Sequence, residues 1–166
     1  MRHTISVLVE NKFGVLARIS TLFAARGFNI DSLAVGETED PAISRMTIVV
    51  KGDDDILEQV TKQLNKLVDV IKVNDFSDIG YVERGLALLK INVNKSNRAE
   101  IIQMVDVFRA KIIDVSQDSI ITEITGDEEK IDAFVKMIMP YGIKEMCQTG
   151  TVALARGNKL KLISNE

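Results

Sequence analysis

The sequence predicts an α+β protein made of two βαββαβ units that follow one another along the chain. Short segments in which apolar residues occupy every second position indicate half-buried strands. Longer segments with apolar residues three and four positions apart indicate helices that pack one face against a core. The same order of strands and helices occurs twice within the 166 residues. Two units of roughly 75 residues each, near the small end of independent domains, fit this order better than one large sheet.

The first unit begins with a strand, a helix and a pair of strands. Ile5, Val7 and Val9 alternate with other residues, as expected for a strand with one buried face. The next segment has helical spacing and ends at an Arg-Gly pair, a helix-stop signal, and a later proline marks a turn between strands. We expect strands at 4–10, 28–37, 44–51 and 68–75, and helices at 15–26 and 53–67.

The second unit repeats this order after a short connection. We place the boundary near Asp75–Glu83, with an N-terminal domain at 1–76 and a C-terminal domain at 83–160. In a βαββαβ unit both helices cover one face of the sheet, so we expect two ferredoxin-like units. The expected strands of the second unit are 86–94, 112–117, 119–126 and one or two within 143–156, and its expected helices are 98–111 and 127–139.

The composition argues against several classes of protein. A net charge of −3 and a pI near 5.3 do not suit a nucleic-acid-binding surface, which normally carries a basic excess. The strands expected at 4–10 and 44–51 contain no aromatic residue on which an RNA base would stack. No apolar run approaches the ~20 residues that span a bilayer, and no signal-peptide pattern opens the chain. Cys147 is the only cysteine, which excludes an intrachain disulfide, so we expect a cytoplasmic protein.

The sequence contains few of the groups that enzymes use for catalysis. His3 is the only histidine, and we expect it to be a solvent-exposed strand residue. One histidine and one cysteine, far apart in sequence, do not suggest a metal cluster or a Cys–His nucleophile pair. The acidic runs at 52–55 and 126–129 each follow a strand and open a helix, where carboxylates cap free amides. We therefore expect neither catalytic residues nor a metal site, and an independent enzyme is disfavoured.

The two units differ at the start of their first helix. In the second unit Asn97 is followed three residues later by Glu100, a capping-box arrangement in which side chains satisfy the first helical amides. The corresponding segment of the first unit, VENKFGVLARI, carries Gly14 three residues after Asn11 and no acidic residue in the first helical turn. Its helix should therefore begin with free N–H groups at the positive end of the helix dipole.

An uncapped helix start of this kind can bind a carboxylate, and a glycine there lets the ligand approach the backbone closely. The dipole supplies only ~0.3–1 kcal/mol, so a ligand needs further contacts. Asn29 and Ile30, at the start of the next strand, would offer an amide and an apolar wall from a second subunit paired along that strand. The alternative is an ordinary glycine-containing turn. The residues expected at the helix start are Asn11, Gly14, Val15, Leu16 and Ala17.

The chain as a whole resembles a known family. The segments ISVLVENKFGVLARISTLFAARGFNIDSLAVG, SRMTIVV and QLNKLVDVIKV resemble the N-terminal ACT domain of the small, regulatory subunits of acetolactate synthase. The later segments FRAKIIDVS, KIDAFVKMIMPYGIKEM and TGTVALARG are similar to the C-terminal domain of the same subunits. The pattern N-x-x-G-x-L-x-R alone is a general ACT signal, and its combination with the other segments is much more specific.

The resemblance implies a protein without chemistry of its own. Subunits of this family bind and activate a thiamine-diphosphate-dependent catalytic subunit and confer feedback inhibition by valine or a related branched-chain amino acid. Thiamine diphosphate, Mg²⁺ and FAD would belong to the catalytic subunit. The family's effector positions match Asn11, Gly14 to Ala17, Asn29 and Ile30 in residue type, whereas Phe13 replaces a small residue or proline, which bears on effector size. The alternative is a free-standing ACT-domain amino-acid sensor, which would purify without a large subunit.

We predict a homodimer that forms along the strand at 28–37. This strand should lie at the edge of its sheet, and it contains no lysine or proline that would block pairing. A symmetric copy that continues the sheet would satisfy the open edge. Crosslinking or small-angle scattering at micromolar concentration is expected to report two chains, and a monomer under these conditions would contradict the prediction.

Overall fold

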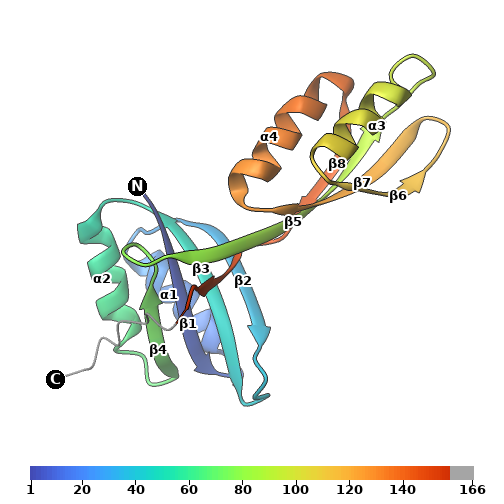
Figure 1. Cartoon of the computed structure of the whole chain (residues 1–166). Coiled ribbons are helices and arrows are strands. Elements are labelled where there is room, and N and C mark those ends of the chain that lie inside the picture. The colour runs from blue at the N-terminus through green and yellow to red at the C-terminus, as the bar shows by residue number, and fades with distance from the viewer. Residues whose placement is uncertain (158–166) are drawn as a thin grey trace. The chain divides into compact units, whose positions relative to one another are not determined.

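The computed structural model describes residues 1–157, which form two compact units (Figure 1). The first unit contains Met1–Val82 together with residues 152–157, and the second contains Glu83–Thr151. The predicted C-terminal limit at residue 160 lies outside the described residues. Within residues 1–157, no helix has the length and apolar character of a membrane span.

An antiparallel sheet with two helices on one face makes up most of the first unit (Figure 1). Its strands lie in the order β2-β3-β1-β4, so β1 and β3 are central and β2 is an edge, as predicted. This order is the βαββαβ topology read from the sequence. The elements are β1 (Arg2–Glu10), α1 (Val15–Ala25), β2 (Ile30–Glu37), β3 (Ile43–Lys51), α2 (Asp54–Leu64) and β4 (Val70–Asp75).

The core of the first unit lies between the sheet and its two helices. β1 and β3 pair so that Ile5 lies opposite Ile48 and Val7 opposite Met46, and all four side chains are buried. Full burial of an apolar side chain of this size contributes about 1.5–3 kcal/mol. The helices add Val15, Ile19, Phe23, Leu57, Val60 and Leu64 to the same core.

The opposite face of this sheet is polar in sequence but partly buried. Thr4, Ser6 and Thr47 are almost inaccessible to solvent, and Arg45 Nη1 donates a hydrogen bond to Ser6 Oγ at 2.9 Å. The last strand, β9 (Val152–Ala155), contacts β1 and pairs with β5. The chain therefore covers part of this face with a strand that comes more than 100 residues after β1.

The second unit repeats the topology of the first. Its strands lie in the order β6-β7-β5-β8, with α3 and α4 packed over a core that includes Leu89, Ile101 and Phe134. The two ferredoxin-like units predicted from the sequence are thus confirmed. The elements are β5 (Tyr81–Asn92), α3 (Arg98–Val107), β6 (Lys111–Val115), β7 (Ser119–Gly126), α4 (Glu128–Ile138), a 3₁₀ turn (Met139–Tyr141) and β8 (Ile143–Gln148).

Two helices end earlier than predicted: α2 ends at Leu64 rather than at residue 67, and the larger difference is in α3. The sequence pattern extends it to residue 111, but α3 ends at Val107. Arg109 adopts a φ of +53°, and the Ala110 N–H donates to Val105 O at 2.9 Å. A residue in this left-handed conformation turns the chain out of a helix, and an arginine gives no sequence signal for it.

The prediction that His3 is solvent-exposed is wrong. His3 retains only 4% of its accessible surface. Its Nδ1 lies 3.2 Å from Ser77 Oγ, and its Nε2 lies 3.2 Å from Gly52 O. The ring points to the helix side of the sheet, because His3 lies opposite the buried Val50 in the β1–β3 register. The imidazole therefore joins the β3–α2 turn to the chain after β4.

Candidate functional site

The predicted binding loop lies between β1 and α1 and is closed by a left-handed glycine. Gly14 has a φ of +82°, and α1 begins at the next residue. This backbone conformation is accessible to glycine at little cost. A Cβ on Gly14 would lie 3.2 Å from Arg18 Nη1, so a side chain at this position would displace the half-exposed guanidinium.

The start of α1 is uncapped, as predicted. Its first turn contains no acidic residue, and no side chain accepts a hydrogen bond at the N-cap. The Val15 N–H reaches Lys12 O at 3.4 Å, and the Arg18 N–H donates to Gly14 O at 3.0 Å. Among the described residues, none accepts from the N–H groups of Leu16 and Ala17. These two amides are the free donors of the helix start.

The Asn11 side chain ties this loop to the end of β2. Its Nδ2 donates to Glu37 Oε1 at 3.0 Å and to Pro41 O at 2.9 Å. The amide nitrogen is therefore used within the unit, while the carboxamide oxygen has no donor among residues 1–157. Asn11 thus places an acceptor oxygen and the Glu37 carboxylate close to the loop.

Charged side chains surround the loop in two pairs. Arg18 binds Asp69 through Nε at 2.8 Å and Nη2 at 2.7 Å. Lys12 Nζ lies 2.6 Å from Glu10 Oε2, and this hydrogen bond raises the pKa of the Lys12 ammonium. Lys12 and Glu10 are both exposed, so this pair contributes little to stability. Asp69 is only 18% exposed, and Arg18 binds it through two nitrogens. Each cation near the free amides is thus already paired with a carboxylate.

Apolar side chains beside the free amides are open to solvent. Phe13 is fully exposed, and Leu16 is 43% exposed. Val15, in contrast, belongs to the core and can present only its backbone to a ligand. The exposed Phe13 is the position at which the sequence departs from the family pattern, and its ring contributes nothing to the core of the unit.

Asn29 and Ile30 lie at the other end of β2 from Asn11. The strand runs from Ile30 to Glu37, so its ends are separated by about 23 Å. Asn29 Nδ2 donates to Asp31 Oδ1 at 2.9 Å, and Ile30 packs against the core. One chain therefore brings Asn11 and Gly14 to Ala17 together, and it holds Asn29 and Ile30 apart from them.

The capping box predicted at the start of α3 is wrong. Asn97 makes no side-chain cap, and its Oδ1 accepts from the Asn94 N–H at 2.8 Å. Asn94 Oδ1 instead accepts from the N–H groups of Ser96 and Asn97 at 2.9 and 3.0 Å. An asparagine turn thus precedes this helix. α3 still differs from α1, because it carries Glu100 in its first turn and has no left-handed glycine.

The acidic runs before α2 and α4 cap these helices, as predicted. Asp53 Oδ1 accepts from the Ile56 N–H at 3.0 Å, and Asp127 Oδ1 accepts from the Lys130 N–H at 2.9 Å. Both helices add two further carboxylates in the first turn, where the helix dipole favours them. Residues 1–157 contain no group of three His, Cys, Asp or Glu side chains arranged to hold a metal ion.

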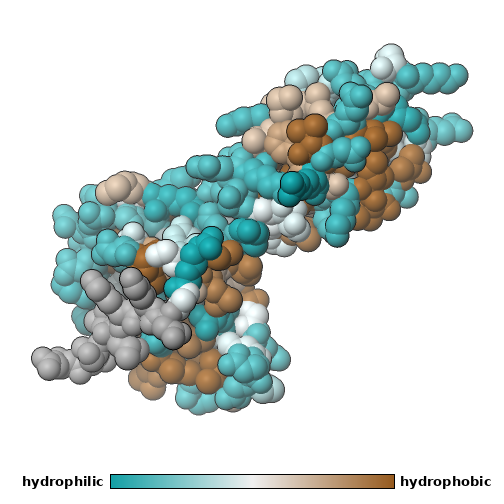
Figure 2. All heavy atoms as spheres, viewed as in Figure 1, coloured by the Kyte–Doolittle hydropathy of each residue, from teal (hydrophilic) through white to brown (hydrophobic). Residues whose placement is uncertain are grey.

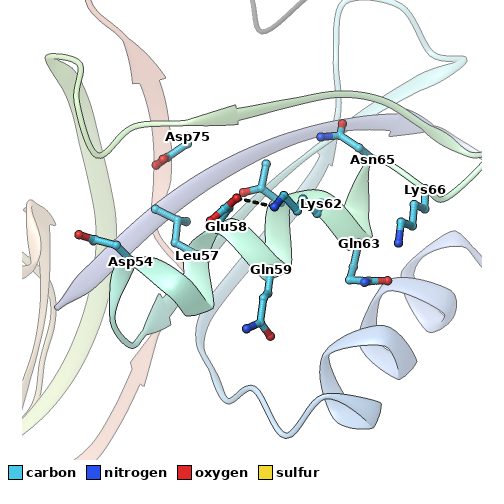
Figure 3. A pocket seen from close by; sticks show the side chains of 10 residues that line it. Asp54, Leu57, Glu58, Gln59, Lys62, Gln63, Asn65, Lys66 and Asp75 are labelled. Atoms are coloured by element: carbon cyan, nitrogen blue, oxygen red, sulfur yellow. Dashed lines mark ion pairs between the residues drawn. The ribbon is translucent and has the colours of Figure 1, made fainter. Parts of the chain in front are cut away.

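A shallow hollow along α2 does not include the predicted site residues (Figure 3). Most of the residues that line it are polar or charged by type. Glu58 pairs with Lys62 along the helix, as the sequence spacing predicts. A second hollow, between α1 and α2, is lined by residues that include Ala17 and Arg18. This second hollow therefore adjoins the loop on the α2 side of α1.

Two family models match the chain, one in each half. Residues 5–72 match the model described as "AHAS small subunit-like ACT domain", and residues 84–157 match "Small subunit of acetolactate synthase". The chain belongs to the acetolactate synthase small-subunit family. The resemblance noted in the sequence is thereby confirmed.

Individual acetolactate synthase small subunits support the same assignment. A probable small subunit of Archaeoglobus fulgidus is 56% identical over 159 residues, which cover 96% of this chain and 99% of that protein. The small subunit of Aquifex aeolicus is 50% identical over 166 residues, which cover 99% and 86%. The crystal structure of the Thermotoga maritima small subunit superimposes with a TM-score of 0.88 at 46% identity, covering 95% and 99%.

Two residues of this small subunit adjoin the loop but were not predicted as site residues. Arg18 lies one helical turn after Gly14, and this i,i+4 spacing was visible in the N-x-x-G-x-L-x-R pattern. Glu37 is 26 positions from Asn11 in sequence. The two residues meet because β1 and β2 run in the same direction on either side of β3 and finish at the same end of the sheet. No local sequence signal identifies that contact.

Replacing Glu100 with glutamine is expected to lower the pKa of Tyr141. The hydrogen bond from the Tyr141 hydroxyl to Glu100 raises this pKa above its ordinary value of 10.0, because the carboxylate favours the protonated phenol. The stabilising effect of the pair is therefore present below pH 10.0 and is lost as the pH rises through the folded-state pKa. NMR titration of ring-labelled tyrosine measures the change, with Tyr81 as the internal control. An unchanged Tyr141 titration in Glu100→Gln would contradict the contact.

Proposed function

We propose that this chain is the regulatory subunit of acetolactate synthase, which binds and activates the thiamine-diphosphate-dependent catalytic subunit. It also confers feedback inhibition by valine or another branched-chain amino acid. The observation that carries the proposal is the match of both halves of the chain to the small-subunit family. The free amides at the start of α1 support an amino-acid effector, because they suit its carboxylate.

The effector site is completed by a second copy of the chain. β2 is an edge strand, and pairing two β2 strands antiparallel about a two-fold axis places the start of one beside the end of the other. Asn29 and Ile30 of one copy then approach Asn11 and Glu37 of the other. The part of β2 from Leu33 to Glu37 suits this pairing, because the irregularity in its register with β3 lies between Ile30 and Ser32.

Each polar group of the amino acid has a counterpart at this site. The carboxylate accepts hydrogen bonds from the free N–H groups of Leu16 and Ala17, near the positive guanidinium of Arg18. The ammonium donates to the Asn11 carboxamide oxygen and the Glu37 carboxylate. The branched side chain packs against Ile30 of the second copy, while Phe13, fully exposed in a single chain, limits the space on the open side.

Inhibition follows from the position of the effector between two chains. Binding favours the dimer geometry that suits the effector, and the affinity for the catalytic subunit changes with that geometry. Allosteric couplings of this kind are typically ~1–3 kcal/mol, enough for clear but partial inhibition.

Reconstitution with a cognate catalytic subunit tests the proposed function. The chain is expected to increase the rate of acetolactate formation, and valine is expected to reverse part of this increase. Leucine and isoleucine serve as comparison effectors. A rate that responds neither to the chain nor to valine would overturn the proposal.

Gly14→Asp is expected to abolish valine inhibition while leaving activation of the catalytic subunit intact. The new carboxylate would lie where the effector carboxylate binds and would repel it. Gly14→Asn is the matched control, because asparagine has nearly the same size, tolerates a positive φ and adds no charge. Inhibition that persists in Gly14→Asp would remove this loop from the effector site, and equal loss in both variants would assign the effect to the side chain's volume.

A further inference from the structure

The outer edge of the second unit carries apolar residues that its own core does not use. β6 is the edge strand beside β7, and all five of its residues are exposed. Soluble proteins usually protect such an edge, because its free N–H and C=O groups pair readily with another strand. β6 is instead rich in β-branched apolar residues, with the sequence KIIDV.

Exposed residues of α3 extend this apolar surface. Val107, at the end of α3, is 79% exposed, and Ile113 and Val115 of β6 are each 55% exposed. α3 contacts β6, so these side chains belong to one region, and Figure 2 shows hydrophobic surface on this unit where Figure 1 draws α3 and β6. We call this region the α3–β6 strip; it consists of Ile102, Val107, Ile112, Ile113 and Val115.

An irregularity in the pairing of β6 with β7 determines on which face of the sheet each β6 side chain lies. Ile112 lies opposite Thr122 and Asp114 opposite Ile121, so Ile113 is an extra residue between them. Side chains paired across a ladder share one face. Lys111 pairs with Glu123 and Asp114 with Ile121, positions that alternate with the buried Thr122. Lys111 and Asp114 therefore both lie on the sheet face away from the helices.

We propose that the α3–β6 strip binds the same strip of a second copy of this chain, with the two β6 strands antiparallel about a two-fold axis. An axis between Ile112 and Ile113 places Ile112 of one copy opposite Ile113 of the other. The same axis places Lys111 of each copy opposite Asp114 of the other. The two resulting Lys–Asp pairs lie on the same face of the sheet. The strand is thus complementary to itself in charge as well as in apolar character, which is what an isologous contact requires.

A copy of the chain fits this edge better than an unrelated strand. Lys111 and Asp114 are the only charged residues of β6, and the two-fold pairing matches both. Lys111 Nζ is 4.0 Å from its own Glu123, and the lysine side chain is 77% exposed, so this loose pair allows the ammonium to reach a second carboxylate. The contact lies entirely within the second unit, whereas the effector dimer uses β2 of the first unit.

Charge exchange tests the contact in the full chain. Lys111→Asp places Asp opposite Asp114, and Asp114→Lys places Lys opposite Lys111, so each single variant is expected to weaken association. Mixing the two variants in equal amounts restores two opposite-charge pairs between unlike chains, and association should recover. Sedimentation velocity over a range of concentrations measures this, and Lys95→Asp supplies the same charge change in an exposed loop as a control.

We expect half-association at a concentration at least ten times higher in each single variant than in the wild type, Lys95→Asp or the mixture. Circular dichroism checks that the variants are folded. Association curves that coincide for the wild type and both single variants would overturn the contact, as would a mixture that behaves like its components. If β6 pairs with a different protein instead, the curves of the wild type and both single variants will coincide. If the chain dimerises only through β2, the variants also coincide with the wild type, and the proposed effector site stands.

Discussion

Hydrogen bonds at the end of β1 fix the part of the molecule on which its proposed function depends. The Glu10 N–H donates to Asp69 O at 2.9 Å, and the Asn11 N–H donates to Ala42 O at 2.7 Å. The chain leaving the central strand is thus held from both sides, by the segment before β4 and by the segment before β3. The left-handed turn at Gly14 and the free amides of α1 therefore sit on a rigid base. Sites built on the ends of regular elements keep their geometry better than sites on long loops.

The two units show how one topology supports different uses. Both place a helix directly after their first strand, and both bury the same kind of apolar stripe beneath it. In the second unit, Asn94 organises the turn and the first helical turn carries Glu100, so an anion would meet a carboxylate there. In the first unit, a glycine and two free amides occupy the equivalent place. The two units therefore share the same kind of core and differ at the start of their first helix.

Most of the fold follows from local patterns, because strand and helix periodicity record which face of an element is buried. The order of elements, the edge position of β2, the caps at Asp53 and Asp127 and the uncapped start of α1 were all predictable in this way. The failures share a different cause. His3 is buried because residues more than 40 positions away surround its ring. Either Asn94 or Asn97 could accept hydrogen bonds from the backbone before α3, and Asn94 forms the turn. Sequence spacing alone does not show which of the two does so.

The site was predictable only in part, for the same reason. Asn11, Gly14 and the amides that follow are neighbours in sequence, so their proximity was certain once the turn was recognised. Glu37 contacts Asn11 because strand pairing brings the ends of β1 and β2 together, and no local sequence pattern predicts that contact. The role proposed for Asn29 requires a second chain, and a single sequence indicates it only through the unprotected edge of β2.

The path of the chain between the units also constrains its biosynthesis. The first unit takes β9 from residues that follow the whole of the second unit, and Arg156 N–H donates to Gly80 O at 2.8 Å within it. A ribosome that has synthesised only the first 82 residues has not yet produced the strand that contacts β1. The second unit is continuous in sequence and can pair β6, β7, β5 and β8 before β9 is synthesised. Of the two units, the one synthesised first is therefore the later to be finished, and a nascent chain lacks this cover over the Thr4–Ser6 face until β9 has been synthesised.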